Sequence, residues 1–119
     1  MTRRQGWHVL REGSRLTLAR RLPARFDIEA RATLPQAAGR LRLAWQIRQD
    51  LWRALQRQRG FSPVVEVTRE PAGVSVRAGG QVDAAPFDRG SLERRIAQVL
   101  ETPANRQRWL RGAGGRETC

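Results

Sequence analysis

Between Pro35 and Arg59 the apolar residues recur with the period of an α-helix. Proline suits the first turn of a helix and Gly60 suits the left-handed position that follows one, so both ends of the stretch are marked. At about 100° per residue, most apolar side chains fall on one face. They are Leu41, Ala44, Trp45, Leu51, Trp52 and Leu55, broadened by Leu43, Ile47 and Ala54. The pattern predicts a long amphipathic helix that must pack on another layer.

Segments with the period of a β-strand lie on both sides of this helix. Residues 7–12 and 15–20 form a predicted hairpin around Gly13-Ser14, and residues 25–33 alternate apolar and charged side chains, as a half-buried strand does. Residues 64–70 and 74–78 form a second predicted hairpin. About five strands are therefore expected, three before the long helix in the sequence and two after it.

The C-terminal third of the chain predicts further helices. Gly79-Gly80 and Pro86 are expected to break the chain before a helix that starts near Ser91. Thr102-Pro103 marks the start of a short last helix that carries Trp109. The element order βββ-α-ββ-α-α favours an α+β fold, in which an antiparallel sheet carries the long helix on one face.

The length of 119 residues suits one domain. We place it at residues 6–111, with flexible ends at residues 1–5 and 112–119, because these ends have little apolar surface to bury. One cysteine, Cys119, allows no internal disulfide, and no run approaches the roughly 18 apolar residues of a membrane span. We expect a protein of the reducing cytoplasm with no membrane span.

The charge of the chain is strongly basic and is carried by arginine. All 23 basic residues are arginines, against 11 acidic residues, and the formal net charge is +12. We interpret the absence of lysine as the codon bias of a GC-rich genome, with a functional origin as the alternative. Codon bias explains this choice of cation better than it explains the excess over acid. Two segments, residues 1–25 and 36–60, hold most of the excess. Such a surface favours an acidic partner.

The inventory of reactive side chains argues against an enzyme. His8 is the one histidine and Cys119 the one thiol, at opposite ends of the chain, so neither a Cys-His pair nor a metal site of these residues is expected. Asp27 and Glu29 share a strand face, but flanking arginines make them charge-pairing residues. No glycine-rich phosphate loop or dinucleotide fingerprint occurs. We predict no catalytic residue, metal or cofactor.

The polar face of the long helix is the main candidate binding surface. Guanidinium groups pair with phosphate or carboxylate oxygens, and glutamine adds hydrogen bonds to sugars or base edges. A solvated face is the alternative, since arginine and glutamine are both good helix formers. With arginines of the N-terminal hairpin, the predicted polyanion-binding residues are Arg42, Gln46, Gln49, Arg53, Arg57, Arg15, Arg20 and Arg21.

Arg48 falls within the apolar arc of the helix, where an unpaired charge is costly. The candidate internal partners are Asp27, Glu29 and Glu66; otherwise Arg48 snorkels to water or meets an acidic group of another molecule. Trp45 and Trp52 are expected in the core, whereas Trp7 and Trp109 are expected nearer the surface. Arg48, Trp7 and Trp109 are therefore candidate partner-binding residues.

Two functions fit these patterns. The first is a small non-enzymatic module that binds a polyanion, RNA or DNA, through arginine–phosphate contacts with strong salt dependence. No helix-turn-helix, zinc-finger or RNP signature occurs in the sequence. The second is a protein-interaction or assembly subunit that docks on an acidic protein surface. A homo-oligomer is one version of this second function. Attachment to an anionic membrane surface is a weaker third alternative.

Overall fold

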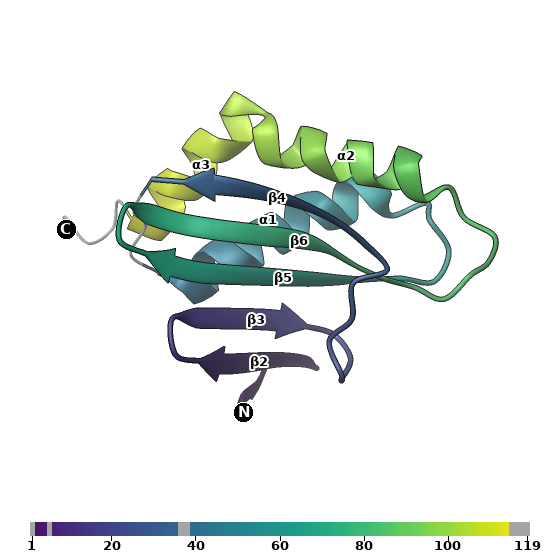
Figure 1. The fold of residues 1–119 in the computed structure, drawn as a ribbon, viewed down its shortest axis with the longest axis horizontal. Helices are drawn as coiled ribbons and strands as arrows, with labels where there is room; N and C mark the ends of the chain where they lie inside the picture. Colours follow the sequence, from purple (N-terminus) through teal and green to yellow (C-terminus); the bar gives the residue numbers. More distant parts are fainter. Residues whose placement is uncertain (1, 5, 36–38, 115–119) are drawn as a thin grey trace.

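The computed structural model describes residues 2–4, 6–35 and 39–114 (Figure 1). Within these residues, six strands and three helices follow one another. The strands are β1 (Thr2–Arg4), β2 (Trp7–Glu12), β3 (Arg15–Ala19), β4 (Ile28–Leu34), β5 (Phe61–Glu70) and β6 (Gly73–Val82). The helices are α1 (Arg40–Leu55), α2 (Arg89–Glu101) and α3 (Pro103–Gly114).

The strands form one antiparallel sheet in the order β1-β2-β3-β5-β6-β4. Helix α1 lies behind β5 and β6, and α2 runs beside it along β4 (Figure 1). The α+β class, the antiparallel sheet and the long helix on one face are therefore confirmed. The sheet differs from the prediction by one short edge strand, β1, so that the element order is ββββ-α-ββ-α-α. Residues 2–4, predicted to lie outside the domain, pair with β2.

The core lies between the sheet and the helices. Alternate residues of the central strands point into it, such as Val65 and Val67 of β5, as the period of two requires. The predicted apolar face of α1 is rotated relative to the buried one. The residues of α1 that are buried are Leu43, Ala44, Ile47, Asp50, Leu51 and Leu55. Trp52, predicted in the core, is 42% exposed, whereas Trp109 of α3, expected near the surface, is fully buried.

Glycine explains a second difference. Strand β6 continues through Gly79-Gly80, where the sequence predicted a break. Its neighbours approach so closely that a Cβ on Gly79 would lie 2.0 Å from the carbonyl oxygen of Ile28, and one on Gly80 would lie 2.1 Å from that of Ser62. These glycines are therefore packing positions inside the sheet.

The helix ends also depart from the prediction. Helix α1 begins at Arg40 after Gly39 and is shorter at both ends than the predicted stretch, of which residues 36–38 lie outside the described part. Helix α2 begins two residues before Ser91, because Asp88 accepts a hydrogen bond from the Ser91 amide at 3.0 Å. Helix α3 begins at Pro103 as predicted and continues through residues 112–114 of the predicted flexible tail; residues 115–119 lie outside the description.

Candidate polyanion-binding surface

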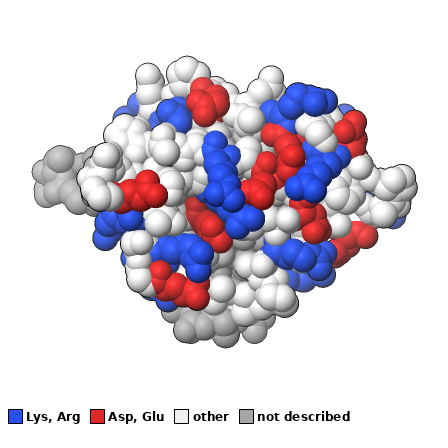
Figure 2. All heavy atoms as spheres, in the orientation of Figure 1, with Lys and Arg blue, Asp and Glu red and all other residues white. Residues whose placement is uncertain are grey.

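The open face of the sheet, opposite the helices, carries arginines that are already paired. Figure 2 shows basic and acidic groups side by side on this face. Glu29 accepts hydrogen bonds from Arg77 at 2.7 Å and from Arg31 at 3.2 Å, and Arg15 pairs with Glu12 at 2.8 Å. The hydrogen bond from Arg77 and the charge of Arg31 hold the pKa of Glu29 below its ordinary value, against the effect of burial.

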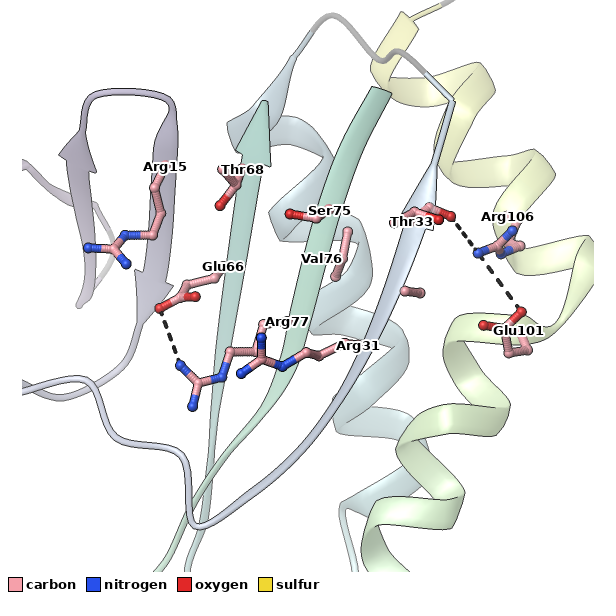
Figure 3. A pocket seen from close by; sticks show the side chains of 11 residues that line it. Arg15, Arg31, Thr33, Glu66, Thr68, Ser75, Val76, Arg77, Glu101 and Arg106 are labelled. Carbon is pink, nitrogen blue, oxygen red and sulfur yellow. Dashed lines mark hydrogen bonds and ion pairs between the residues drawn. The ribbon is translucent and has the colours of Figure 1, made fainter. Parts of the chain in front are cut away.

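A hollow of about 760 Å³ on this face is also lined by arginines that are already paired. Figure 3 shows Arg77 directed to Glu66, with the two charges 3.8 Å apart, and Arg106 directed to the Thr33 carbonyl oxygen. Arg106 donates to that oxygen at 2.8 Å and lies 3.9 Å from Glu101. The cations of the hollow are therefore held by protein oxygens, which leaves little positive potential for a ligand.

The outer surface of α1 and α3 has a different balance of basic and acidic residues. The two helices contain one acidic residue, Asp50, and that residue is buried. Their arginines are Arg40, Arg42, Arg48, Arg53, Arg106, Arg108 and Arg111. Arg42, Gln49 and Arg53 are exposed and follow one another at helical spacing, so they form a ridge along α1.

Beside this ridge, a groove of about 450 Å³ separates α1 from α3. Gln46 and Gln49 line one side, and Arg108 and Arg111 line the other. The side-chain Oε1 of Gln46 is buried and accepts no hydrogen bond from any described residue. We call the ridge and the groove together the α1–α3 surface: Arg42, Gln46, Gln49, Arg53, Arg108 and Arg111.

Asp50 lies beneath this surface, and its carboxylate contacts two of the surface arginines. Its Oδ2 accepts hydrogen bonds from the Trp109 Nε1 at 2.6 Å and from Arg108 at 2.9 Å, and its Oδ1 lies 3.9 Å from Arg53. Asp50 is only 8% exposed, so its charge does not belong to the outer surface of α1. The carboxylate is instead the buried connection that sets α3 against α1 and orients Arg108, whose other nitrogen donates to Asn105 at 2.7 Å.

The predicted binding residues fall into two separate groups. Those of α1 lie on the α1–α3 surface, and Arg57 is exposed just beyond the end of the helix. The hairpin arginines do not join them. Arg15 pairs with Glu12, Arg21 pairs with Asp83, and Arg20 lies over the Trp7 ring at 5.5 Å from its centroid.

Arg108 and Arg111 were absent from the predicted set, although a sequence signal for them exists. The segment from Pro103 to Gly114 contains three arginines and no acidic residue. Its contact with α1 could not be read from the sequence, because it depends on the burial of Trp109 against Asp50.

A second cationic arrangement lies on the other flank of α1. The Arg48 guanidinium lies between two indoles, 5.3 Å from the centroid of Trp7 and 5.2 Å from that of Trp45. The two rings meet edge to face at 5.6 Å. Burial lowers the pKa of Arg48, and its Nε is buried and donates to no atom of the described residues.

None of the three acidic partners predicted for Arg48 lies against it. Asp27 binds Arg25 and the Val82 amide, while Glu29 and Glu66 bind Arg77. Aromatic rings replace a carboxylate as the partner of Arg48, as cation–π contacts allow. The predicted candidate Trp7 is 8% exposed and part of this arrangement, whereas the predicted candidate Trp109 has no exposed surface to offer a partner.

A cavity of about 400 Å³ opens beside these side chains. Its lining consists of Trp7, Arg20, Arg48, Trp52, Phe61, Ser62 and Pro63. We call it the tryptophan–arginine pocket. It has two cations, three aromatic rings and no acidic group in its lining, so it suits a flat or anionic ligand.

Within the described residues, no group of three or more His, Cys, Asp or Glu side chains could hold a metal ion. Each helix of that part of the chain is too short or too polar to cross a membrane. No protein-family model, curated protein or solved structure matches the chain.

Proposed function

We propose that this protein is a non-enzymatic module that binds nucleic acid through phosphate contacts on the α1–α3 surface. The observation that carries the proposal is the unequal pairing of arginines on the two sides of the molecule. On the open sheet face, Glu12, Glu29 and Glu66 hold the arginines. On α1 and α3, Asp50 is the one carboxylate, and it is buried.

The spacing of the ridge suits a polymer of phosphates. Arg42 and Arg53 are separated by about 16 Å along the helix, at 1.5 Å per residue. Phosphates of one strand repeat every ~3.4 Å along a duplex axis, so a ridge of this length passes several of them. Arg108 and Arg111 widen the surface across the groove, and Gln46 and Gln49 add neutral hydrogen-bonding groups.

An acidic protein surface is the alternative partner. A large exposed apolar patch would favour that function. The large hydrophobic side chains exposed within the described residues are Leu22 and Trp52, and Trp52 lines the tryptophan–arginine pocket. Because these two side chains do not make a large apolar patch, the basic charge of α1 and α3 favours phosphates over a protein surface. A reducing cytoplasm is the compartment that we propose, since one cysteine allows no internal disulfide.

The proposal is tested by fluorescence anisotropy with a labelled oligonucleotide over a series of salt concentrations. The double variant Arg42→Gln/Arg53→Gln removes two ridge charges and should weaken binding about tenfold, because charge-assisted hydrogen bonds are lost. The slope of log K against log salt should become shallower by about 1.4, at ~0.7 for each single-strand phosphate contact.

Arg31→Gln is the matched control, since Arg31 lies on the open sheet face beside Glu29. It should bind within twofold of wild type. Equal losses in the double variant and in Arg31→Gln would contradict the proposal, as would affinity that does not change with salt. Competition by polyglutamate as strong as that by the oligonucleotide would favour the acidic protein partner instead.

A further inference from the structure

Trp52 is an exposed aromatic side chain in a position that the fold does not require. It is 42% exposed on the rim of the tryptophan–arginine pocket, one helical turn after Arg48. The core of α1 is filled by other residues, among them Leu51 and Leu55. An exposed indole beside a cavity is characteristic of binding sites, because the ring offers a large rigid contact area.

The two cations of this pocket have no carboxylate partner among the described residues. Arg20 and Arg48 both lie over the Trp7 ring, at 5.5 Å and 5.3 Å from its centroid. Gathering two positive charges around one ring is unfavourable in the absence of an anion. Arg48 lines the pocket, and its guanidinium group carries several N–H donors. The pocket therefore offers positive charge and a hydrogen-bond donor beside flat apolar surfaces.

A nucleobase meets these requirements together. Unpaired bases stack on aromatic rings and on guanidinium planes, and their edges accept hydrogen bonds. The Ser62 side chain adds a hydroxyl to the lining. A cavity of about 400 Å³ has the size of a small-molecule site. A base within a duplex is stacked on its neighbours and cannot enter such a cavity without leaving the helix.

The pocket and the α1–α3 surface also lie next to each other on α1. At about 100° per residue, Arg48 and Trp52 project on one flank of the ridge and Gln46 on the other. Trp52 and Arg53 are neighbours in the sequence, so a strand whose phosphates follow the ridge passes the mouth of the pocket.

We infer that the tryptophan–arginine pocket receives one unpaired base of a single-stranded nucleic acid while the α1–α3 surface holds its phosphates. This rests on the proposed function and specifies its ligand as single-stranded. Trp52 stacks on the base, Arg48 donates to its edge, and Arg20 pairs with the adjoining phosphate.

The test compares three labelled probes of equal length: a single-stranded oligonucleotide, the same strand with abasic sites, and a duplex. Trp52→Ala removes the exposed ring and leaves the core intact. It should weaken binding of the single strand about tenfold, within the range measured for base–aromatic stacking. Binding of the abasic strand and of the duplex should change less than twofold, because they place no base in the pocket. Leu22→Ala is the matched control, since Leu22 is 39% exposed and lies outside the pocket lining; it should leave all three affinities unchanged.

The outcomes separate this inference from the proposed function. If Trp52→Ala weakens the abasic strand as much as the single strand, or weakens neither, the base pocket is wrong. The proposed function would still hold if Arg42→Gln/Arg53→Gln weakened all three probes. If no probe binds at low salt, both fail. Polyglutamate binding that depends on Trp52 would also overturn the inference, because the pocket would then be a carboxylate site.

Discussion

At the scale of single residues, Asp50 shows how a buried charge connects two helices. The carboxylate is 8% exposed and accepts from an indole N–H and from a guanidinium. A buried carboxylate is stable only when donors compensate its lost hydration. Trp109 in turn is fully buried and needs an acceptor for its N–H. Each group therefore makes the burial of the other tolerable.

Asp50→Ala should lower the free energy of unfolding by about 3 kcal/mol, because it leaves the Trp109 N–H buried without an acceptor and removes the partner of Arg108. Urea denaturation followed by tryptophan fluorescence measures this change. Arg53→Ala is the control, since Arg53 is exposed and lies 3.9 Å from Asp50; it should change stability by less than ~0.5 kcal/mol. Equal stability of the wild type and Asp50→Ala would show that the contact contributes nothing.

Glu29 gives the fold a defined acid sensitivity. Hydrogen bonds from Arg77 hold the pKa of Glu29 below its ordinary value of 4.5 in the folded state. A lowered folded pKa means that the contribution is fully present above the ordinary value and is lost as the pH falls below it. The free energy of unfolding should therefore decrease as the pH is lowered from about 4.5.

Glu29→Gln should reduce stability by about 1 kcal/mol at pH 7 and flatten this acid dependence. Denaturation midpoints between pH 7 and pH 3 measure both effects. Glu70→Gln, which changes an exposed carboxylate at the end of β5, should leave the profile as in wild type. A Glu29→Gln variant with an unchanged pH profile would contradict the role given to the pair.

At the scale of elements, the pattern of the strands was easier to predict than the rotation of α1. In β4, charged Glu29 and Arg31 alternate with apolar residues, so the strand has one face to bury. In α1, leucines and tryptophans occupy more than half of the circumference, and the sequence does not say which half is buried. Trp109 decides this by covering Asp50, a contact between residues 59 positions apart.

The glycines of β6 are the second feature that local patterns could not resolve. Gly79-Gly80 resembles a loop in sequence, but its function in the sheet depends on how closely β4 and β5 approach. Gly79→Ala should lower the free energy of unfolding by about 3 kcal/mol, because the new Cβ would overlap the Ile28 carbonyl oxygen. Thermal unfolding measures the loss.

Gly90→Ala provides a matched glycine-to-alanine control in helix α2. There the atom nearest to a new Cβ, apart from the flanking residues and the helix backbone, would be a nitrogen of Arg94 at 3.4 Å, and alanine has the higher helix propensity. This variant should be as stable as wild type or slightly more stable. Similar losses in both variants would show that close packing of β4 on β6 is not the cause.

At the scale of the whole molecule, charge is divided between a neutralised sheet face and a basic helical layer. The α1 part of the candidate surface could be predicted, because helical spacing alone places Arg42, Gln49 and Arg53 on one ridge. The hairpin part could not be predicted, because it depends on long-range pairing. Arg21, for example, pairs with Asp83, which lies 62 positions later in the sequence. The tryptophan–arginine pocket likewise joins β2, Arg20 just after β3, α1 and β5, which no local pattern connects.

This division implies that the basic surface reduces the stability of the fold. Arg42 lies in the first turn of α1, which contains no acidic residue, so its charge opposes the positive end of the helix dipole. Arg42→Gln should therefore raise the free energy of unfolding by about 0.5 kcal/mol at low ionic strength. The gain should vanish near ~1 M salt, where the Debye length is only about 3 Å.

Arg31→Gln makes the same chemical change on the sheet face and should bring no gain, because it removes a partner of Glu29 at 3.2 Å. Denaturation of the two variants at low and high salt gives the comparison. A residue whose removal stabilises the fold and weakens nucleic-acid binding is placed for binding, because stability alone would favour its loss. If Arg42→Gln were less stable than wild type at low salt, Arg42 would have a structural role, and its place in the proposed phosphate-binding ridge would lose this support.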